Sequence, residues 1–198
     1  MSQYNVPVKL EGSHVRLEPL TVDHIGPLVE VGLDPDLWRW TQAILSTEDD
    51  LRAYVETALA EQAIGRSLPF ATVERSSGRV IGSTRFGTIE PAHRRVEIGW
   101  TWIARPWQRT AINTEAKYLM LRHAFEVLGC IRVELKTDVL NERSRRAIER
   151  LGAREEGVLR DHVITSSGRI RGTVYYSILA AEWPDVRARL VERMASSR

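Results

Sequence analysis

The segment at residues 106–116 has the features of an anion-binding loop. It follows an alternating run of apolar and polar residues at 96–104 and precedes a helical pattern at 114–128. A loop that enters a helix leaves backbone N–H groups without carbonyl partners, and the helix dipole adds partial positive charge at the same end. The segment could therefore bind a phosphate or a pyrophosphate. The alternative is an ordinary turn between a strand and a helix.

The predicted strand before this loop carries one carboxylate. Regular alternation predicts a core face made of Val96, Ile98, Trp100 and Trp102. The opposite face then holds Glu97, Gly99 and Thr101. A carboxylate beside a glycine suits a face that opens onto a ligand, where Glu97 could act as a general base, directly or through water. Glu97 could equally form an ion pair with Arg85 or Arg94, because perturbed carboxylates also occur in structural pairs.

A serine lies on the apolar face of a later predicted helix, which Asn141 caps and Gly152 ends. The spacing i, i+3, i+4, i+7 puts four residues on one face: Ser144, Ala147, Ile148 and Leu151. A hydroxyl on an apolar face needs a partner. That partner could be a ligand, or the backbone of the first helical turn.

Several segments resemble the GNAT superfamily of acyltransferases. Residues 108–113 read Gln108-x-x-Ala111-x-Asn113, similar to the family's pyrophosphate loop Gln/Arg-x-x-Gly-x-Gly/Ala but without its glycines. Four other segments also resemble the family, at residues 14–20, 96–100, 141–153 and 156–160. The resemblance extends over nearly the whole chain and is to the branch that contains the ribosomal-protein alanine N-acetyltransferases.

The resemblance implies that acetyl-CoA binds between two separated central strands and that the acceptor amine attacks the thioester directly. Glu97 would then be the general base, and Ser144 would protonate the departing thiolate. The resemblance further implies the following cofactor contacts: Ile103, Ala104 and Asn141 with pantetheine; Gln108, Arg109, Thr110, Ala111, Ile112 and Asn113 with the pyrophosphate; and Arg145 or Arg146 with the 3′-phosphate. Arg145 and Arg146 could instead form a solvated basic face.

The resemblance also indicates where the acceptor would bind. Trp38 and Trp40 would line the acceptor pocket, although packing is the commoner reason for such an aromatic pair. Of Tyr175 and Tyr176, which alternate on one strand, one is expected to pack and Tyr175 could face the acceptor. A protein α-amino group has a pKa of about 8 and a lysine side chain one of about 10.4, so an N-terminal amine is the less demanding acceptor.

Length and composition agree with one soluble domain covering residues 1–198. No apolar run reaches the ~20 residues that span a bilayer, and no signal peptide is apparent, so a cytoplasmic location is expected. The net charge of +2 is too small to indicate nucleic acid. The five histidines have no metal-ligand spacing, and Cys130 is expected to be a small buried residue.

Periodicity and turn residues predict an α/β (α+β) fold with a mixed, mostly antiparallel central sheet flanked by helices on both faces. Strands are predicted at residues 15–20, 69–74, 80–89, 94–104, 133–137, 158–165 and 169–179. Helices are predicted at residues 22–32, 48–64, 114–128, 142–151 and 182–195, with a turn or short helix at 34–36.

The leading hypothesis is an N-acetyltransferase that uses acetyl-CoA, needs no metal, and acts as a monomer or homodimer on a primary amine, such as a protein N-terminus. One alternative is an enzyme for small-molecule amines. Another is a non-catalytic module that binds or senses coenzyme A, because Ala111 and Asn113 place Cβ atoms where the backbone would approach phosphate. DNA binding through Arg143, Arg145, Arg146 and Arg150 is disfavoured, because apolar residues interrupt this charge.

Overall fold

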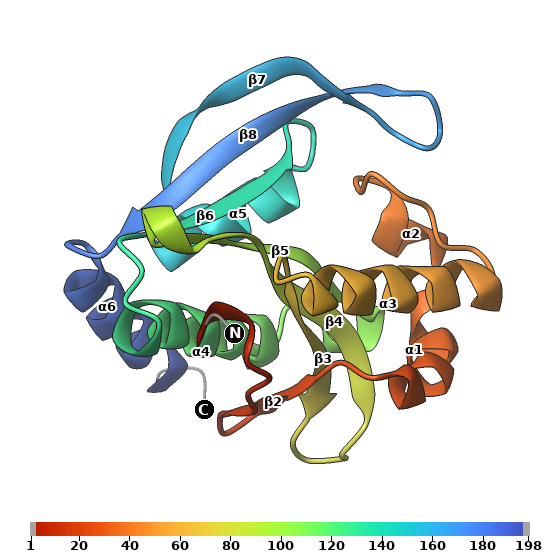
Figure 1. Ribbon diagram of the computed structural model, residues 1–198, viewed down its shortest axis with the longest axis horizontal. Coiled ribbons are helices and arrows are strands. Elements are labelled where there is room, and N and C mark those ends of the chain that lie inside the picture. The colour runs from red at the N-terminus through yellow and green to blue at the C-terminus, as the bar shows by residue number, and fades with distance from the viewer. Residues whose placement is uncertain (1–2, 196–198) are drawn as a thin grey trace.

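The computed structural model describes residues 3–195, which are built around one eight-stranded sheet (Figure 1). The strands are β1 (Leu10–Glu11), β2 (Val15–Pro19), β3 (Leu68–Glu74), β4 (Val80–Glu90), β5 (Arg95–Ile103), β6 (Arg132–Asp138), β7 (Arg154–Ile164) and β8 (Ile170–Leu179). Their order in the sheet is β1-β2-β3-β4-β5-β6-β8-β7. Only β5 and β6 run parallel; the other neighbours are antiparallel. The predicted mixed, mostly antiparallel sheet is confirmed.

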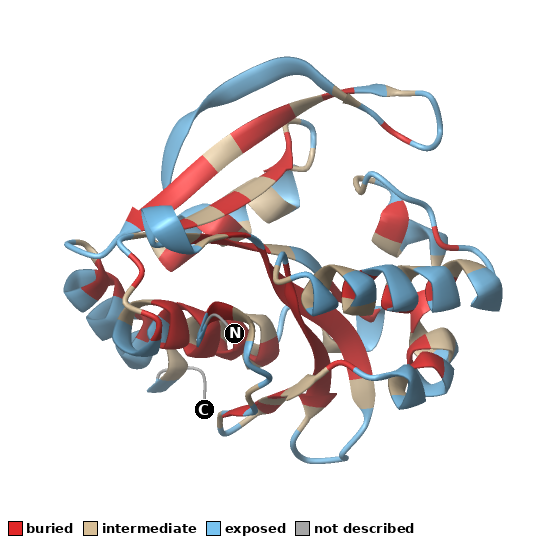
Figure 2. Cartoon of the chain, viewed as in Figure 1, coloured by how far each residue is buried: buried red, intermediate tan, exposed pale blue. Residues whose placement is uncertain are grey.

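Helices cover both faces of this sheet, as predicted. The α-helices are α1 (Ile25–Gly32), α2 (Pro35–Trp38), α3 (Glu48–Ala63), α4 (Ala111–Arg122), α5 (Glu142–Leu151) and α6 (Trp183–Ala195). Short helical turns are η1 (Gln3–Asn5), η2 (Val22–His24), η3 (Pro91–His93), η4 (Arg105–Trp107) and the π-helical η5 (His123–Val127), which continues α4. Successive residues of β3 show the two layers: Phe70 packs in the cluster that contains α4 and α6, and Ala71 in the cluster that contains α1 and α3. Buried residues follow the central strands and the inner sides of the helices (Figure 2).

The predicted helix ends are largely confirmed, because they depend on local hydrogen bonds. Thr47 caps α3: its hydroxyl accepts from the N–H of Asp50 at 3.1 Å, and the Asp50 carboxylate accepts from the N–H of Thr47 at 2.9 Å. Asn141 caps α5 by accepting from the N–H of Ser144 at 3.1 Å. Gly152 follows α5 with a φ of 97°, a left-handed conformation that glycine adopts without strain.

Three predicted boundaries were wrong. α4 begins at Ala111 rather than at residue 114, because Thr110 is the capping residue. The first helix begins with the 3-10 turn η2, since an α-helix from Val22 would require an N–H that Pro27 lacks. β7 begins at Arg154, four residues before the predicted start, and β1 was not predicted at all.

A β-bulge in β5 also breaks the predicted alternation. Ser83 pairs with Trp102 and Arg85 with Gly99, so two residues of β5 oppose one residue of β4. Trp100 lies in the bulge with a φ of 50°. It is 41% exposed, and its ring centroid lies 4.9 Å from the guanidinium of Arg85, which pairs with Glu61 of α3. Trp102 is 5% exposed and packs in the α1–α3 cluster, apart from Val96 and Ile98. The prediction that Trp100 and Trp102 share the core face of Val96 and Ile98 is therefore wrong.

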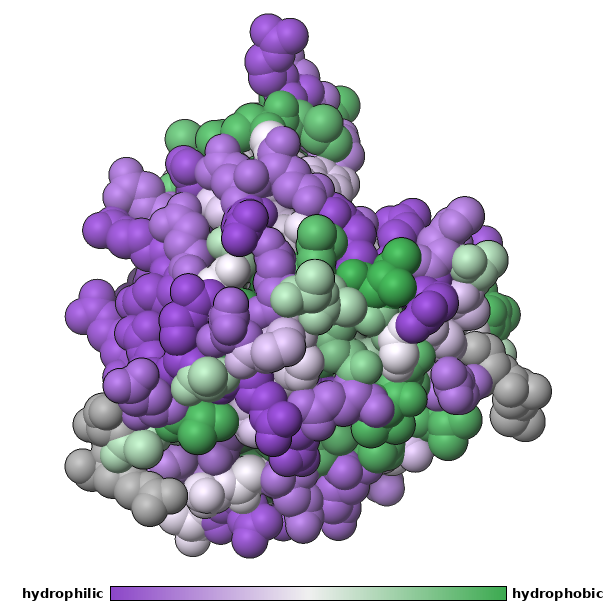
Figure 3. Space-filling view, turned by 90° about the vertical axis from the view of Figure 1, so that its left-hand side faces the viewer, coloured by the Kyte–Doolittle hydropathy of each residue, from purple (hydrophilic) through white to green (hydrophobic). Residues whose placement is uncertain are grey.

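The β7–β8 hairpin projects beyond the rest of the sheet. It arches across the top of Figure 1, and β7 is exposed along nearly its whole length (Figure 2). Seen from the α6 side, the surface is mostly hydrophilic, with hydrophobic residues in a band near the top of the view and in a patch on its right half (Figure 3). The hairpin tip returns to the body of the protein, where the N–H of Ser166 donates to the carbonyl of Gln42 at 2.9 Å.

Candidate active site

The candidate site is a cleft that begins where β5 and β6 separate. The two strands pair at Arg95–Arg132, Val96–Val133 and Glu97–Glu134; beyond these pairs, β5 continues to Ile103 and β6 to Asp138. A cleft of about 1650 Å³ opens between them. One arm of the cleft reaches the start of α4 and the face of α5, and the other reaches Glu97 and α3.

The start of α4 has the anion-binding geometry expected of a helix N-terminus. The Thr110 hydroxyl accepts from the N–H of Ile112 at 3.3 Å and donates to the carbonyl of Trp107 at 2.8 Å. The N–H groups of Ala111 and Asn113 belong to the first helical turn, where no intrahelical carbonyl is available. The left-handed residue is Arg109, with a φ of 63°; Ala111 and Asn113 have negative φ angles. The Cβ atoms of Ala111 and Asn113 therefore cause no backbone strain.

Gln108 links this loop to two other elements. Its side-chain Nε2 donates to the carbonyl of Ile103 at 2.7 Å, and its Oε1 accepts from Nη1 of Arg143 at 2.7 Å. The first bond holds the loop against the end of β5, and the second holds it against α5. Gln108 thus positions the wall of the cleft.

Most of the residues predicted to bind the cofactor line this arm: Ile103, Gln108, Arg109, Thr110, Ala111, Asn113, Ser144 and Arg146. Three residues predicted to bind the cofactor do not line the cleft: Ala104, Ile112 and Asn141. The Ala104 N–H donates to Ile81 and its carbonyl accepts from Trp107, so Ala104 has no backbone pair left for pantetheine. Ile112 is 4% exposed and packs in the core, and its N–H is bonded to Thr110.

The α5 residues occupy different parts of the cleft. Ser144 is half-buried in the wall, and its hydroxyl has no hydrogen-bond partner among residues 3–195. Arg146 lies at the exposed edge, where its Nη2 contacts Glu142 at 2.8 Å. Asn141 lies outside the main cleft and lines a smaller cavity with Arg143 and Gln108. Arg145 donates to the hydroxyl of Tyr176 at 3.2 Å.

Glu97 lies in the other arm, on the opposite face of β5 from α4. It is 3% exposed and lines the cleft. Its Oε2 is 2.8 Å from Nζ of Lys136 and accepts from the hydroxyl of Thr88 at 2.9 Å. The alternative in which Glu97 pairs with Arg85 or Arg94 is therefore wrong, because its ion-pair partner is Lys136. Arg85 pairs with Glu61 at 2.9 Å, and Nε of Arg94 donates to the carbonyl of Gly129 at 2.8 Å.

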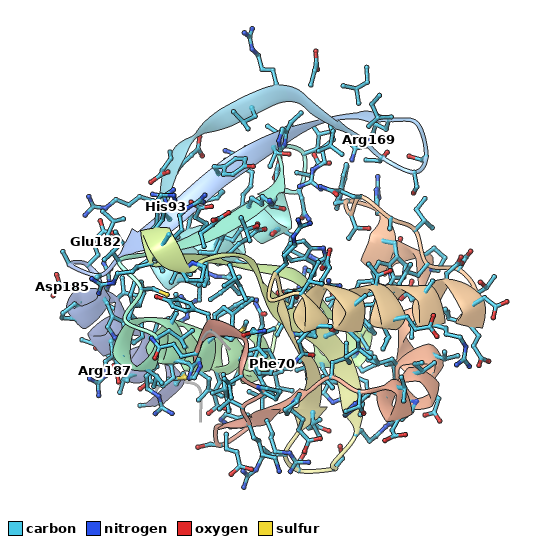
Figure 4. All side chains as sticks on the ribbon, in the orientation of Figure 1. Phe70, His93, Arg169, Glu182, Asp185 and Arg187 are labelled. Carbon is cyan, nitrogen blue, oxygen red and sulfur yellow. The ribbon has the colours of Figure 1, made fainter. Side chains whose placement is uncertain are left out.

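The aromatic residues near this arm have distinct roles. Trp38 is 3% exposed, donates its indole N–H to the carbonyl of Gly32 at 2.7 Å, and packs on Trp102, so it is a core residue that forms part of the cleft wall. Trp40 also lines the cleft, and the Arg169 guanidinium lies 5.5 Å from its ring. Figure 4 shows Arg169 near the hairpin tip.

Tyr175 and Tyr176 divide as predicted between the two faces of β8. Tyr176 is fully buried. Tyr175 is half-buried, and its ring centroid is 5.6 Å from Nζ of Lys136. Tyr175 is thus beside the Glu97–Lys136 pair, although it does not line the cleft itself.

Sequence reasoning missed two buried cations that line the cleft, Lys117 and Arg171. Nζ of Lys117 donates to the hydroxyl of Thr84 at 3.2 Å and to that of Thr101, and burial lowers the pKa of Lys117 to about 7. The available signal was helical spacing, which puts Lys117 one turn after Asn113. For Arg171, the signal was its alternation with Thr173 and Tyr175 on β8.

Comparison with known proteins identifies the family. Residues 14–154 match the family described as "Acetyltransferase (GNAT) domain". The chain therefore belongs to the GNAT acetyltransferase family. It matches less than two thirds of the length of the curated relatives.

Individual relatives extend this comparison. The chain is 37% identical over 106 residues to "Putative ribosomal N-acetyltransferase YdaF" of Bacillus subtilis strain 168, a match that covers 54% of this chain and 57% of that protein. A crystal structure described as a "putative acetyltransferase from T. thermophilus" is 42% identical, with a TM-score of 0.86, and the match covers 95% of this chain and 97% of that chain. Mycobacterium smegmatis RimJ in complex with CoA-disulfide shares the fold at 24% identity, with a TM-score of 0.82 over 98% of this chain and 97% of that chain.

The described residues contain no helix that is long and apolar enough to cross a membrane. Within residues 3–195 there is also no group of three or more His, Cys, Asp or Glu side chains that could hold a metal ion.

Proposed function

We propose that this chain uses acetyl-CoA to acetylate a primary amine directly, and that the amine is the N-terminus of a protein. The observation that carries the proposal is the cleft with two arms, which opens where β5 and β6 separate. The helix N-terminus suited to a diphosphate lines one arm, and a buried carboxylate lines the other. A donor and an acceptor could thus approach each other from opposite sides of the sheet.

The cofactor arm fits acetyl-CoA, which would supply an activated thioester carbonyl. The amide N–H groups of Ala111 and Asn113 would bind the diphosphate. The side-chain Oδ1 of Asn113 is buried in this arm without a hydrogen-bond partner among the described residues, which is a feature of a site that a polar ligand completes. Arg146, at the edge of this arm, would bind a further phosphate. The solved RimJ complex with CoA-disulfide supports the assignment, as does the family.

The acceptor arm has a group that can remove a proton. Glu97 would accept the proton of the attacking amine, directly or through a water, while Lys136 and Thr88 hold its carboxylate in place. The Ser144 hydroxyl, which is uncommitted among the described residues, would donate a proton toward the leaving sulfur. Positioning of the two reactants would provide much of the rate enhancement.

A protein N-terminus is the favoured acceptor for two reasons. Its pKa of about 8 leaves a fair fraction of the amine neutral near physiological pH, so a single carboxylate is an adequate base. In addition, the relative from B. subtilis is named as a ribosomal N-acetyltransferase.

The test is an acetylation screen with N-terminal peptides and small amines, read by release of the CoA thiol. Native protein is expected to acetylate peptides, and Glu97→Gln to lower kcat by about 100-fold or more without weakening acetyl-CoA binding. The matched control is Glu90→Gln at the end of β4, which lies outside the cleft and should retain full activity.

Two other results of this screen would favour the alternative functions. Acetylation of small amines but not of peptides would replace the protein acceptor with a metabolite. Thermal stabilisation by acetyl-CoA with no acetylation of any amine would refute catalysis and favour a sensing module.

A further inference from the structure

Arg171, the second residue of β8, is a buried cation in the acceptor arm. Its side chain is 7% exposed and lines the cleft. The nearby hairpin tip contacts the segment between α2 and α3 through Ser166 and Gln42, and Arg169 stacks on Trp40. Arg171 therefore lies close to the place where the hairpin reaches over to the acceptor side of the cleft.

The guanidinium of Arg171 is poorly satisfied. It makes no hydrogen bond to any residue in the described part of the chain, and its Nε is buried without a partner. The nearest acid is Asp138, whose Oδ2 is 3.9 Å from Nε of Arg171. That carboxylate already contacts Nη2 of Arg169 and accepts from the N–H of Leu140 through its other oxygen, at 2.9 Å. Asp138 is thus only a weak partner for Arg171.

Three other cations near this arm each have a carboxylate oxygen within hydrogen-bond distance. Arg85 pairs with Glu61, Lys136 with Glu97, and Arg169 with Asp138. Arg171 shares Asp138 with Arg169 and is the one of these four cations whose nearest carboxylate, at 3.9 Å, is beyond hydrogen-bond distance among the described residues. Burial lowers the pKa of Arg171, which reflects the cost of keeping this charge away from water. A buried charge without a hydrogen-bonded partner is unfavourable, and a carboxylate that reached Arg171 would supply one.

We propose that Arg171 binds a carboxylate of the acceptor, so that the enzyme selects amines that carry an acidic group close by. This inference rests on the function proposed above and adds the chemical class of the acceptor. A guanidinium fits a carboxylate with two parallel hydrogen bonds, which fixes the orientation of the bound molecule as well as its position. For a protein acceptor, the carboxylate belongs to an Asp or Glu side chain next to the N-terminal residue. A free amino acid offers the same chemistry through its α-carboxylate.

The test compares matched pairs of acceptors. N-terminal peptides with Asp or Glu at the second position are assayed against the same peptides with Asn or Gln, and free aspartate and glutamate form a separate arm. Native protein is expected to show a KM for the Asp and Glu peptides about 10- to 100-fold lower than for the Asn and Gln peptides. This factor corresponds to the free energy of a charge-assisted hydrogen bond. Arg171→Gln should abolish this preference while it retains turnover of the amide peptides, and Arg171→Lys should restore part of it.

Arg160→Gln is the matched control, because it removes an exposed charge from the neighbouring strand β7 outside the cleft. It should leave the preference unchanged. Equal KM values for acidic and amide peptides in native protein, or an unchanged preference in a folded Arg171→Gln variant, would overturn the proposal. A preference for free aspartate or glutamate over peptides would identify the small-molecule source. Acetylation of no amine at all would instead overturn the proposed function, and with it the assignment of an acceptor.

Discussion

Replacing Lys117 with methionine is expected to stabilise the fold, by an amount that depends on pH. The Lys117 ammonium is buried in the cleft wall, and its partners are the hydroxyls of Thr84 and Thr101; no carboxylate pairs with it among the described residues. Burial lowers its pKa to about 7. The two hydroxyls also bond to each other at 2.7 Å, so they keep a partner when the lysine is removed.

The magnitude follows from the pKa. Lowering the pKa of this ammonium from 10.5 to about 7 corresponds to about 5 kcal/mol of added free energy for the charged form in the folded state. Methionine has a similar length and no charge. It loses two hydrogen bonds worth about 1 kcal/mol each, so the net gain below pH 7 is expected to be about 3 kcal/mol.

The sign of the pH dependence is fixed by proton uptake. Between about pH 7 and pH 10.5, the unfolded state of the unsubstituted protein carries a proton on Lys117 that its folded state lacks. The free energy of unfolding of this protein therefore rises with pH in this window. The advantage of Lys117→Met should therefore be largest near pH 6 and should shrink toward about pH 9.5. Urea unfolding of both proteins across this range measures the difference.

Lys9→Met provides the control, because the Lys9 side chain is 53% exposed. Its effect on the free energy of unfolding should stay within about 0.5 kcal/mol. The reasoning is refuted if Lys117→Met is less stable than native protein near pH 6, or if the difference does not change with pH.

Two further predictions test the cleft and the bulge. Ser144→Ala is expected to lower kcat about tenfold, with unchanged acetyl-CoA affinity as measured by calorimetry. An unchanged kcat would exclude the proton-donor role of Ser144. A loss of acetyl-CoA affinity would indicate a binding role instead. Trp102→Ala is expected to cost about 3 to 5 kcal/mol in unfolding free energy and Trp100→Ala about 1 kcal/mol or less, because Trp102 is buried and Trp100 is exposed. Equal losses in urea unfolding would contradict this difference in burial.

Features that depend on neighbours in the chain could be predicted from the sequence. The capping residues Thr47 and Asn141 and the terminating Gly152 make their contacts within a few residues, so their side-chain chemistry was sufficient. The loop that enters α4 was predicted for the same reason, although the helix begins at Ala111, three residues before the predicted start, with Thr110 as its cap. The strands were predicted because alternating burial leaves a repeating pattern, which failed where the bulge at Trp100 interrupted it.

The partners of the buried charges were decided only by the tertiary structure. Glu97 pairs with Lys136 on the adjacent strand, and the other residues that sequence reasoning considered, Arg85 and Arg94, contact other groups. Spacing in the sequence relates Lys117 to Asn113 and Arg171 to Tyr175, but it does not show that both cations are buried in the wall of the cleft. The sequence by itself was sufficient to predict most helices and strands and the family to which the chain belongs. Which charges are buried, and which lack a partner, depends on strands and helices distant in the chain, because burial and electrostatic pairing are set by the packing of the whole sheet.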